Sequence, residues 1–211
     1  MGSGKRKIIM NTFEKQNCWH TIGTNYYIRL FQKKFPSYAV THYGIEHCST
    51  KYLSGGVTLD ETLIAERDKP DLYHCDKKNN HSFFGEVKTE PGKSKNFAVQ
   101  AMSIVSAKVW EHMGDLIYNF VELDNDTKEP VSCQCAYAKD LVANFPKYIL
   151  IPRTAVCEAW EEWTKHFFPN VEYKKIPYMG GSSGHPFWLL PKNSSYLMDF
   201  NLFYTSFNKG I

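Results

Sequence analysis

Two short apolar segments, separated by a polar turn, place the strongest constraint on how this 211-residue chain can fold. The first segment runs from Lys69 to Asp76 and the second from Ser82 to Thr89, and turn-forming residues bound both of them. The intervening Lys77-Lys78-Asn79-Asn80 has the composition of a tight turn. The pattern therefore predicts a β-hairpin.

The expected register of this hairpin brings acidic side chains together. With Lys77 to Asn80 as the loop, Asp71 lies opposite Glu86. Side chains alternate along a strand, so Asp71, Glu86 and Lys88 share one face while Val87 points to the other. Two facing carboxylates repel each other, and a hard divalent cation favours such a pair of oxygen ligands. A slip of one residue in the loop would move Asp71 to the wrong face.

A family resemblance rests on the same residues. Pro70-Asp71 followed by Glu86-Val87-Lys88 resembles the signature of the PD-(D/E)xK nuclease superfamily, which includes restriction endonucleases, Holliday-junction resolvases and viral cap-snatching endonucleases. The resemblance covers roughly Thr21 to Leu123. It implies an α/β fold with a restriction-endonuclease-like core, in which helices flank a central mixed β-sheet. Residues 124–211 would then be C-terminal additions to a single nuclease-like domain spanning residues 1–211.

The resemblance also implies a metal site. Asp71 and Glu86 would bind one or two Mg²⁺ or Mn²⁺ ions, with the backbone carbonyl of Val87 as a further oxygen ligand. Magnesium accepts this arrangement because it prefers oxygen ligands and keeps several of its waters. Lys88 would orient the attacking water or stabilise the phosphate charge.

Further candidates for the site come from elsewhere in the chain. Many family members add an earlier acid, for which Glu46, Glu61 and Glu66 are candidates, and we place Glu66 at the metal because it lies close to Pro70. Gln100 would hold a metal-bound water or phosphate from the second helix, as in exonuclease-like members. Resolvase-like members carry an acid on the first helix, and this sequence has none there.

Three lysines near the motif are candidates for contacting nucleic acid: Lys93, Lys95 and Lys108. The formal net charge of +3 and the pI near 8.4 permit a polyanionic partner without requiring one. For any single lysine, a solvated surface position is the alternative interpretation.

Hydrophobic periodicity predicts the remaining elements. We expect helices over Thr21–Phe35, over Asn96–Met113 and from Thr154 to Pro169, and strands over Tyr38–Tyr43, Val57–Ile64, Leu116–Leu123 and Tyr148–Ile151. The segment Val131–Val142 fits a strand or a helix equally well, and the C-terminal remainder reads as a loop-rich aromatic region.

Together these features favour a metal-dependent phosphodiester hydrolase, with a DNA endonuclease as the leading hypothesis. One alternative is an RNA endonuclease, a structure-specific nuclease or an exonuclease with the same site. Another is a non-catalytic nucleic-acid-binding protein. A homodimer is expected by analogy with enzymes that cut both strands of a duplex. The chain has no secretory leader and no membrane-spanning run, which predicts a cytoplasmic or nuclear protein with reduced cysteines and no membrane partner.

Overall fold

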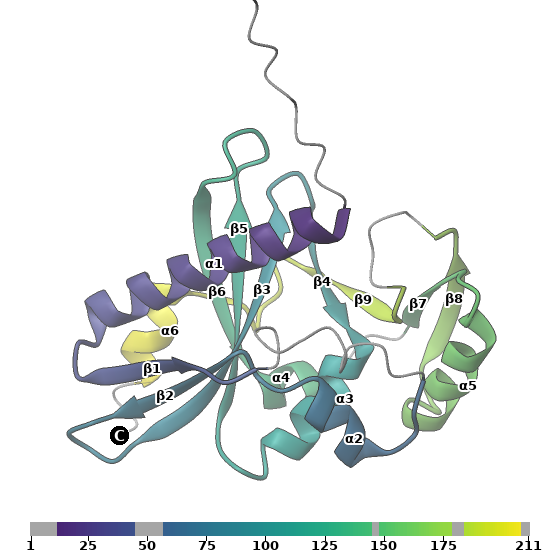
Figure 1. The fold of residues 1–211 in the computed structure, drawn as a ribbon, viewed down its shortest axis with the longest axis horizontal. Coiled ribbons are helices and arrows are strands. Elements are labelled where there is room, and N and C mark those ends of the chain that lie inside the picture. Colours follow the sequence, from purple (N-terminus) through teal and green to yellow (C-terminus); the bar gives the residue numbers. More distant parts are fainter. Residues whose placement is uncertain (1–11, 45–56, 145–147, 179–183, 208–211) are drawn as a thin grey trace, which may run out of the picture.

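Two mixed β-sheets and their flanking helices build the computed structural model, which describes residues 12–44, 57–144, 148–178 and 184–207 (Figure 1). The first sheet has the strand order β1-β2-β3-β5-β6-β10 and the second has the order β4-β9-β7-β8. The first sheet consists of β1 (Tyr38–His42), β2 (Leu72–Asp76), β3 (Ser82–Pro91), β5 (Leu116–Leu123), β6 (Pro130–Tyr137) and β10 (Met198–Asp199). The second consists of β4 (Asn96–Gln100), β7 (Tyr148–Pro152), β8 (Glu172–Ile176) and β9 (Phe187–Pro191). The predicted α/β class with a mixed sheet flanked by helices is confirmed.

The β2–β3 hairpin has the predicted register. Leu72 pairs with Gly85 and Cys75 pairs with Ser82, as a loop over Lys77 to Asn80 requires. Any residue larger than glycine would clash at position 85, because a Cβ there would lie 2.7 Å from Cε1 of the buried His74 ring. Gly85 therefore allows the His74 ring to pack directly against the backbone of β3, one residue before Glu86.

Strand β3 loses one of its two strand neighbours halfway along its length. Its first half pairs antiparallel with β2, while β5 runs parallel to it over the whole range from Phe84 to Pro91. A parallel pair needs a crossover connection, which here consists of β4 and α3 (Ala101–Trp110). Because β2 begins only at Leu72, β3 has a single strand neighbour in this sheet from Glu86 onward.

The two faces of the first sheet bury separate hydrophobic clusters. Helices α1 (Thr12–Lys34) and α6 (Phe200–Phe207) cover one face, where Phe31, Phe83 and Tyr204 are fully or almost fully buried. Figure 1 shows α1 crossing in front of β3, β5 and β6. The opposite face packs against α2 (Glu61–Arg67), α3, α4 (Ala138–Ala143), α5 (Cys157–Phe167) and the second sheet.

The strand predicted over Val57–Ile64 is wrong, because this region contains helix α2. Asp60 caps the helix, and its side chain accepts a hydrogen bond of 3.1 Å from the backbone N–H of Leu63. Ile64 and Ala65 are buried against α3. The Asp60 cap and the burial of Ile64 and Ala65 stabilise this short helix. The helix has too few apolar residues for its periodicity to be recognised in the sequence.

The helix predicted over Asn96–Met113 is wrong in its first part. Asn96 to Gln100 forms β4, which pairs antiparallel with β9 from far along the chain. Phe97 and Val99 are completely buried in the alternating pattern of a strand, and the helix begins only at Ala101. Gln100 is consequently the last residue of a strand instead of a helical residue.

The prediction is more accurate for several other elements. The strand Leu116–Leu123 has its predicted limits, and the first predicted helix is found but begins earlier, at Thr12. Val131–Val142 contains both of the alternatives, since β6 ends at Tyr137 and α4 follows at once. The loop-rich prediction for the C-terminal remainder is wrong, because β8, β9, β10 and α6 lie there. In the part of the chain that the structure describes, no helix is long and apolar enough to cross a membrane.

Candidate active site

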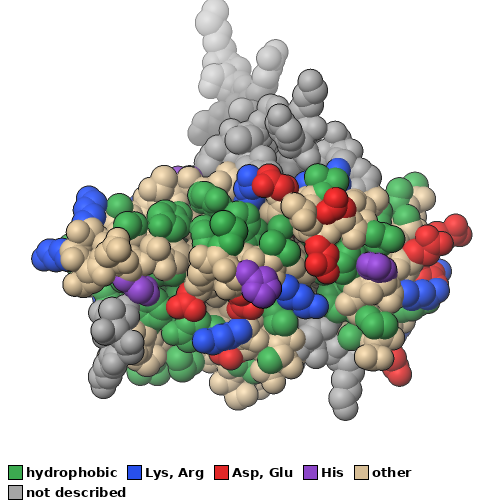
Figure 2. All heavy atoms as spheres, turned by 90° about the horizontal axis from the view of Figure 1, so that it is seen from below, with side chains coloured by type: hydrophobic (Ala, Val, Ile, Leu, Met, Phe, Trp, Pro, Cys, Tyr) green, Lys and Arg blue, Asp and Glu red, His purple; other side chains and the backbone are tan. Residues whose placement is uncertain are grey.

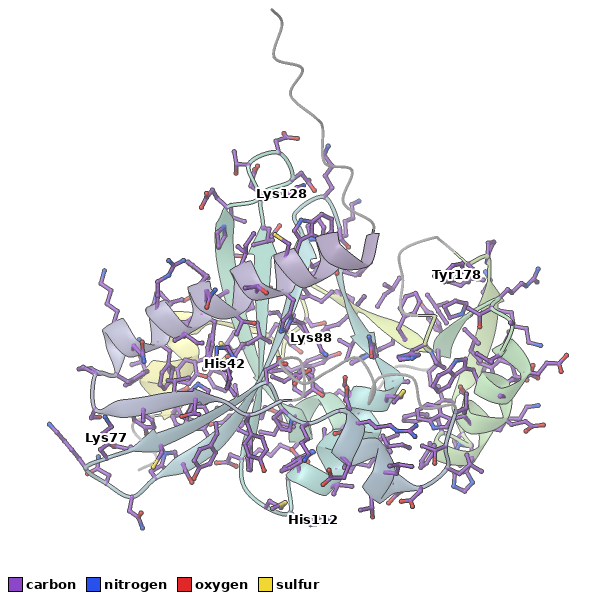
Figure 3. The ribbon with its side chains drawn as sticks, viewed as in Figure 1. His42, Lys77, Lys88, His112, Lys128 and Tyr178 are labelled. Carbon is purple, nitrogen blue, oxygen red and sulfur yellow. The ribbon has the colours of Figure 1, made fainter. Side chains whose placement is uncertain are left out.

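The hairpin brings Asp71, Glu86 and Lys88 together. Asp71 directly precedes β2, and its Oδ2 accepts a hydrogen bond of 2.6 Å from the backbone N–H of Val87. The Lys88 Nζ lies 2.5 Å from Glu86 Oε1. Asp71 and Glu86 are only 7% and 8% exposed, so the carboxylates meet in a largely dehydrated setting. Figure 3 shows Lys88 near the middle of the molecule, beside β3.

A further acid, Asp68, belongs to this group, which we call the acidic cluster: Asp68, Asp71 and Glu86, with Lys88 as its cation. Asp68 follows the last turn of α2, and its carbonyl accepts a hydrogen bond of 2.6 Å from the Ser106 hydroxyl of α3. Its charge acts on both Glu86 and Lys88. The sequence prediction does not include Asp68, because it treats the segment before this residue as a strand, although Asp68 lies only three residues before Asp71.

Burial and like charge oppose the ionised form of Glu86. Burial raises the pKa of Glu86 most strongly, the negative charges of Asp71 and Asp68 raise it further, and Lys88 only partly reverses the shift. Burial alone would lower the pKa of Lys88, but the attraction of Glu86, Asp68 and Asp71 raises it above its ordinary value. Lys88 therefore stays charged, and the cluster demands positive charge in its immediate surroundings.

Helix α1 contributes His20 to the edge of the cluster. The His20 Nε2 lies 3.7 Å from Asp71 Oδ1 and 3.2 Å from the Thr24 hydroxyl one helical turn later. Sequence reasoning missed this residue because the predicted helix began at Thr21, one position after it. The helix that crosses the sheet therefore places an imidazole next to the first acid of the motif.

Two of the other predicted acids, Glu66 and Glu61, lie at exposed positions on α2. Glu66 is 60% exposed and forms an ion pair of 2.9 Å with Lys69, so the prediction of Glu66 as a metal ligand is not supported by its position. Glu61 is exposed at the first position of α2, and Glu46 lies outside the described residues. Asp68, two residues after Glu66, is the nearby acid whose charge acts on Glu86 and Lys88.

The remaining predicted residues lie at varying places. Gln100 is half-buried at the end of β4, where it pairs with Phe187 of β9. Lys93 and Lys95 are exposed in the turn between β3 and β4. The Lys108 Nζ lies 5.6 Å from the centre of the Phe168 ring, which ties this exposed lysine to the end of α5.

A buried polar network supports the backbone of β3 from behind. Asn119 of β5 is completely buried, and its Nδ2 donates to the carbonyls of Glu86 and Ile117 at 3.3 and 3.1 Å. Its Oδ1 accepts from the Tyr204 hydroxyl of α6 at 3.2 Å and from the Cys135 thiol at 3.4 Å. The network continues through Tyr27 of α1 to His74 of β2, with distances of 2.8 Å from the Tyr204 hydroxyl to the Tyr27 hydroxyl and 3.0 Å from there to His74 Nε2.

The backbone of Val87 is oriented toward Asp71. In an extended strand, the N–H and C=O of one residue point to the same side. The Val87 N–H points to Asp71, and the Glu86 carbonyl points the other way, to Asn119 of β5. The Val87 carbonyl therefore faces the edge of β3 that β2 has left open, on the side of Asp71.

The oxygen atoms of the cluster are of the kind that hard divalent cations prefer as ligands. No protein-family model, curated protein or solved structure matches this chain. Within the described ranges, no three His, Cys, Asp or Glu side chains are arranged to hold a metal ion as they stand. Magnesium, however, is commonly bound through one or two carboxylates and several waters. Asp71, Glu86 and the Val87 carbonyl offer such oxygens, and the Lys88 ammonium already acts there as a stand-in cation.

Glu90, farther along β3, predicts a pH-dependent stability. Burial raises the pKa of Glu90 from 4.5 to about 7, although Lys192 and the Ala98 backbone N–H act in the opposite direction. Between these two values, the folded protein keeps a proton that the unfolded chain has released. The free energy of unfolding should therefore fall as the pH rises from 4.5 to about 7, and the Glu90→Gln variant should lack this component.

Urea unfolding of both proteins across this range would measure the effect. Glu86 contributes a slope of the same sign in both proteins, so the difference between the two profiles isolates Glu90. Parallel profiles for the wild type and Glu90→Gln would contradict the shift. If the shift is present, the difference in the free energy of unfolding between the wild type and Glu90→Gln should change steadily up to neutral pH and then level off.

Proposed function

We propose that this protein is a Mg²⁺-dependent nuclease, most consistent with a DNA endonuclease. The observation that carries the proposal is the convergence of Asp71, Glu86 and Lys88 in a partly buried group to which Asp68 adds a third negative charge. A buried excess of carboxylates is costly for a folded protein unless it serves a cation. The lysine two residues after the glutamate gives that group a positive charge suited to phosphate.

The order of elements supports a restriction-endonuclease-like core. Helix α1 precedes an antiparallel meander of β1, β2 and β3, and α3 leads to β5, which runs parallel to β3. The resemblance implies the same order of one helix, three strands, a second helix and a fourth strand. Helix α2 and strand β4 are insertions into that order, and the second sheet would be an addition to the core.

The residues of the cluster divide the chemistry among them. Asp71, Glu86 and the Val87 carbonyl would hold the Mg²⁺, which when bound lowers the pKa of a water and offsets charge on phosphate oxygens. Lys88 would donate hydrogen bonds to the attacking water or to a phosphate oxygen. His20 lies beside Asp71 and would orient that carboxylate.

We place the nucleic-acid contact on the exposed Lys93 and Lys95, in the turn that follows the cluster along β3. Figure 2 shows a face of the molecule on which basic and acidic side chains lie intermingled, so that face offers no continuous basic surface. With a net charge of only +3, binding should depend on few phosphate contacts and weaken moderately with salt. A homodimer would supply two sites for cutting both strands of a duplex.

A cleavage assay on duplex, single-stranded and branched DNA, and on RNA, tests the proposal. We expect cleavage of duplex DNA with Mg²⁺ or Mn²⁺, and none when the ion is chelated. Calcium should bind but support little turnover, because its looser geometry holds the attacking water less well. Cleavage that continues undiminished in excess chelator would rule out the mechanism, and cleavage of RNA alone would reassign the substrate.

A further inference from the structure

The Lys88 ammonium occupies the place where a bound cation would act. It contacts Glu86 Oε1 at 2.5 Å, and no more than 21% of the Lys88 side chain is exposed. The charges of Asp68 and Asp71 also act on this ammonium. If all three acids are ionised, one ammonium leaves the cluster with two negative charges in excess. A divalent cation in its place would neutralise the cluster more completely.

We propose that Lys88 is the resident cation of the metal-free cluster, and that a divalent cation expels its ammonium from Glu86 when it binds. The proposal rests on the proposed function, since it describes how the same site is loaded. Two facts about β3 make the exchange possible. Glu86 and Lys88 share one strand face at positions two residues apart, and the four-carbon lysine side chain can swing away without a change in the backbone.

Electrostatic repulsion drives the exchange. Glu86 Oε1 cannot serve both Lys88 and a metal ion at full strength, and two cations a few ångströms apart in a largely dehydrated cluster repel each other. Loading would therefore turn Lys88 outward, toward the position of a phosphate. Lys88 would face the substrate only when the metal is present. Metal binding and the contact between Lys88 and phosphate would therefore occur together.

The ammonium resonances of the lysines in a nitrogen-15 NMR spectrum provide a direct test without substrate. We expect the Lys88 ammonium to give a protected signal in the metal-free protein, assigned by its absence in Lys88→Met. Addition of Mg²⁺ should shift this signal or remove it. The Lys192 ammonium is an internal control, because it pairs with Glu122 at 3.0 Å and is 17% exposed; its signal should not change.

Affinity for Mn²⁺, measured by titration calorimetry at pH 8.5, provides the second readout. Lys88→Met should bind Mn²⁺ about tenfold more tightly than the wild type, because the competing charge is gone. Lys88→Arg keeps the charge and should bind like the wild type. Lys174→Met, which alters an exposed lysine on β8, should also leave the affinity unchanged.

The outcomes separate this inference from the proposed function. If Mn²⁺ binds and DNA is cleaved, but the Lys88 signal is unmoved and Lys88→Met binds no more tightly, the exchange is wrong and the nuclease stands. If neither wild type nor Lys88→Met binds a divalent cation, both proposals are overturned. A moved signal together with tighter binding by Lys88→Met supports the exchange, whichever nucleic acid is cut.

Discussion

Replacing Asp71 with asparagine is expected to abolish metal-dependent phosphodiester cleavage while leaving the fold intact. An amide oxygen can still accept the hydrogen bond from the Val87 N–H, which measures 2.6 Å in the wild type, but it lacks the charge that binds the metal. A bound metal contributes several kcal/mol of transition-state stabilisation, so the rate should fall by about 1000-fold. Cleavage rates at saturating Mg²⁺, with circular dichroism as a check on folding, measure the effect.

Two comparisons sharpen this prediction. Asp126→Asn alters an exposed aspartate in the turn after β5 and should cleave at the wild-type rate. The double variant Asp71→Asn with Glu86→Gln should be little worse than Asp71→Asn alone, since residues that hold one ion act as a unit. A rate for Asp71→Asn within a few-fold of the wild type would show that Asp71 is a structural carboxylate that secures the hairpin.

Replacing Asn119 with alanine is expected to lower the free energy of unfolding by about 3 kcal/mol. The substitution removes every hydrogen bond of a completely buried side chain and leaves a small cavity between β3, β5 and α6. The Tyr204 hydroxyl and the Cys135 thiol would each lose a partner without gaining access to water. Urea denaturation at neutral pH measures the loss.

Smaller losses are expected for related variants. Tyr204→Phe removes a single hydroxyl and should cost about 1 kcal/mol, because Tyr27 and Asn119 lose only one shared partner. Asn170→Ala, at an exposed position after α5, should be almost neutral. Equal stability of Asn119→Ala and Asn170→Ala would mean that the buried network adds nothing to folding.

Local sequence was sufficient for the hairpin and for the residues it joins. The turn Lys77 to Asn80 fixed the loop length, and loop length fixes which residues lie opposite each other. The position of Asp71 opposite Glu86 follows from that count alone. Strand β5 was equally predictable, because its eight residues are mostly apolar and a polar turn follows them.

Long-range contacts decided the elements that the sequence did not reveal. Ala98 falls on the apolar helical stripe that continues through Met102 and Val105, which favours a helix, but pairing of Asn96–Gln100 with β9, about ninety residues later, makes this segment a strand. The packing of α2 against α3 and of α1 against the sheet places Asp68 and His20 beside the motif, and of the two only Asp68 lies near it in sequence. The approach of charged side chains from separate elements depends on tertiary structure, and it produces no periodic pattern in the sequence.

The hydrogen bond between Tyr204 and Asn119 bears on the order in which this chain is completed during synthesis. A ribosome delivers β3, with Glu86 and Lys88, well before it delivers α6, and until then Asn119 and Tyr27 lack the hydroxyl that joins them. The network behind β3 therefore closes last. A nascent chain that has already formed the β2–β3 hairpin still lacks Tyr204, whose hydroxyl binds the Asn119 side chain that in turn binds the backbone of β3 at Glu86.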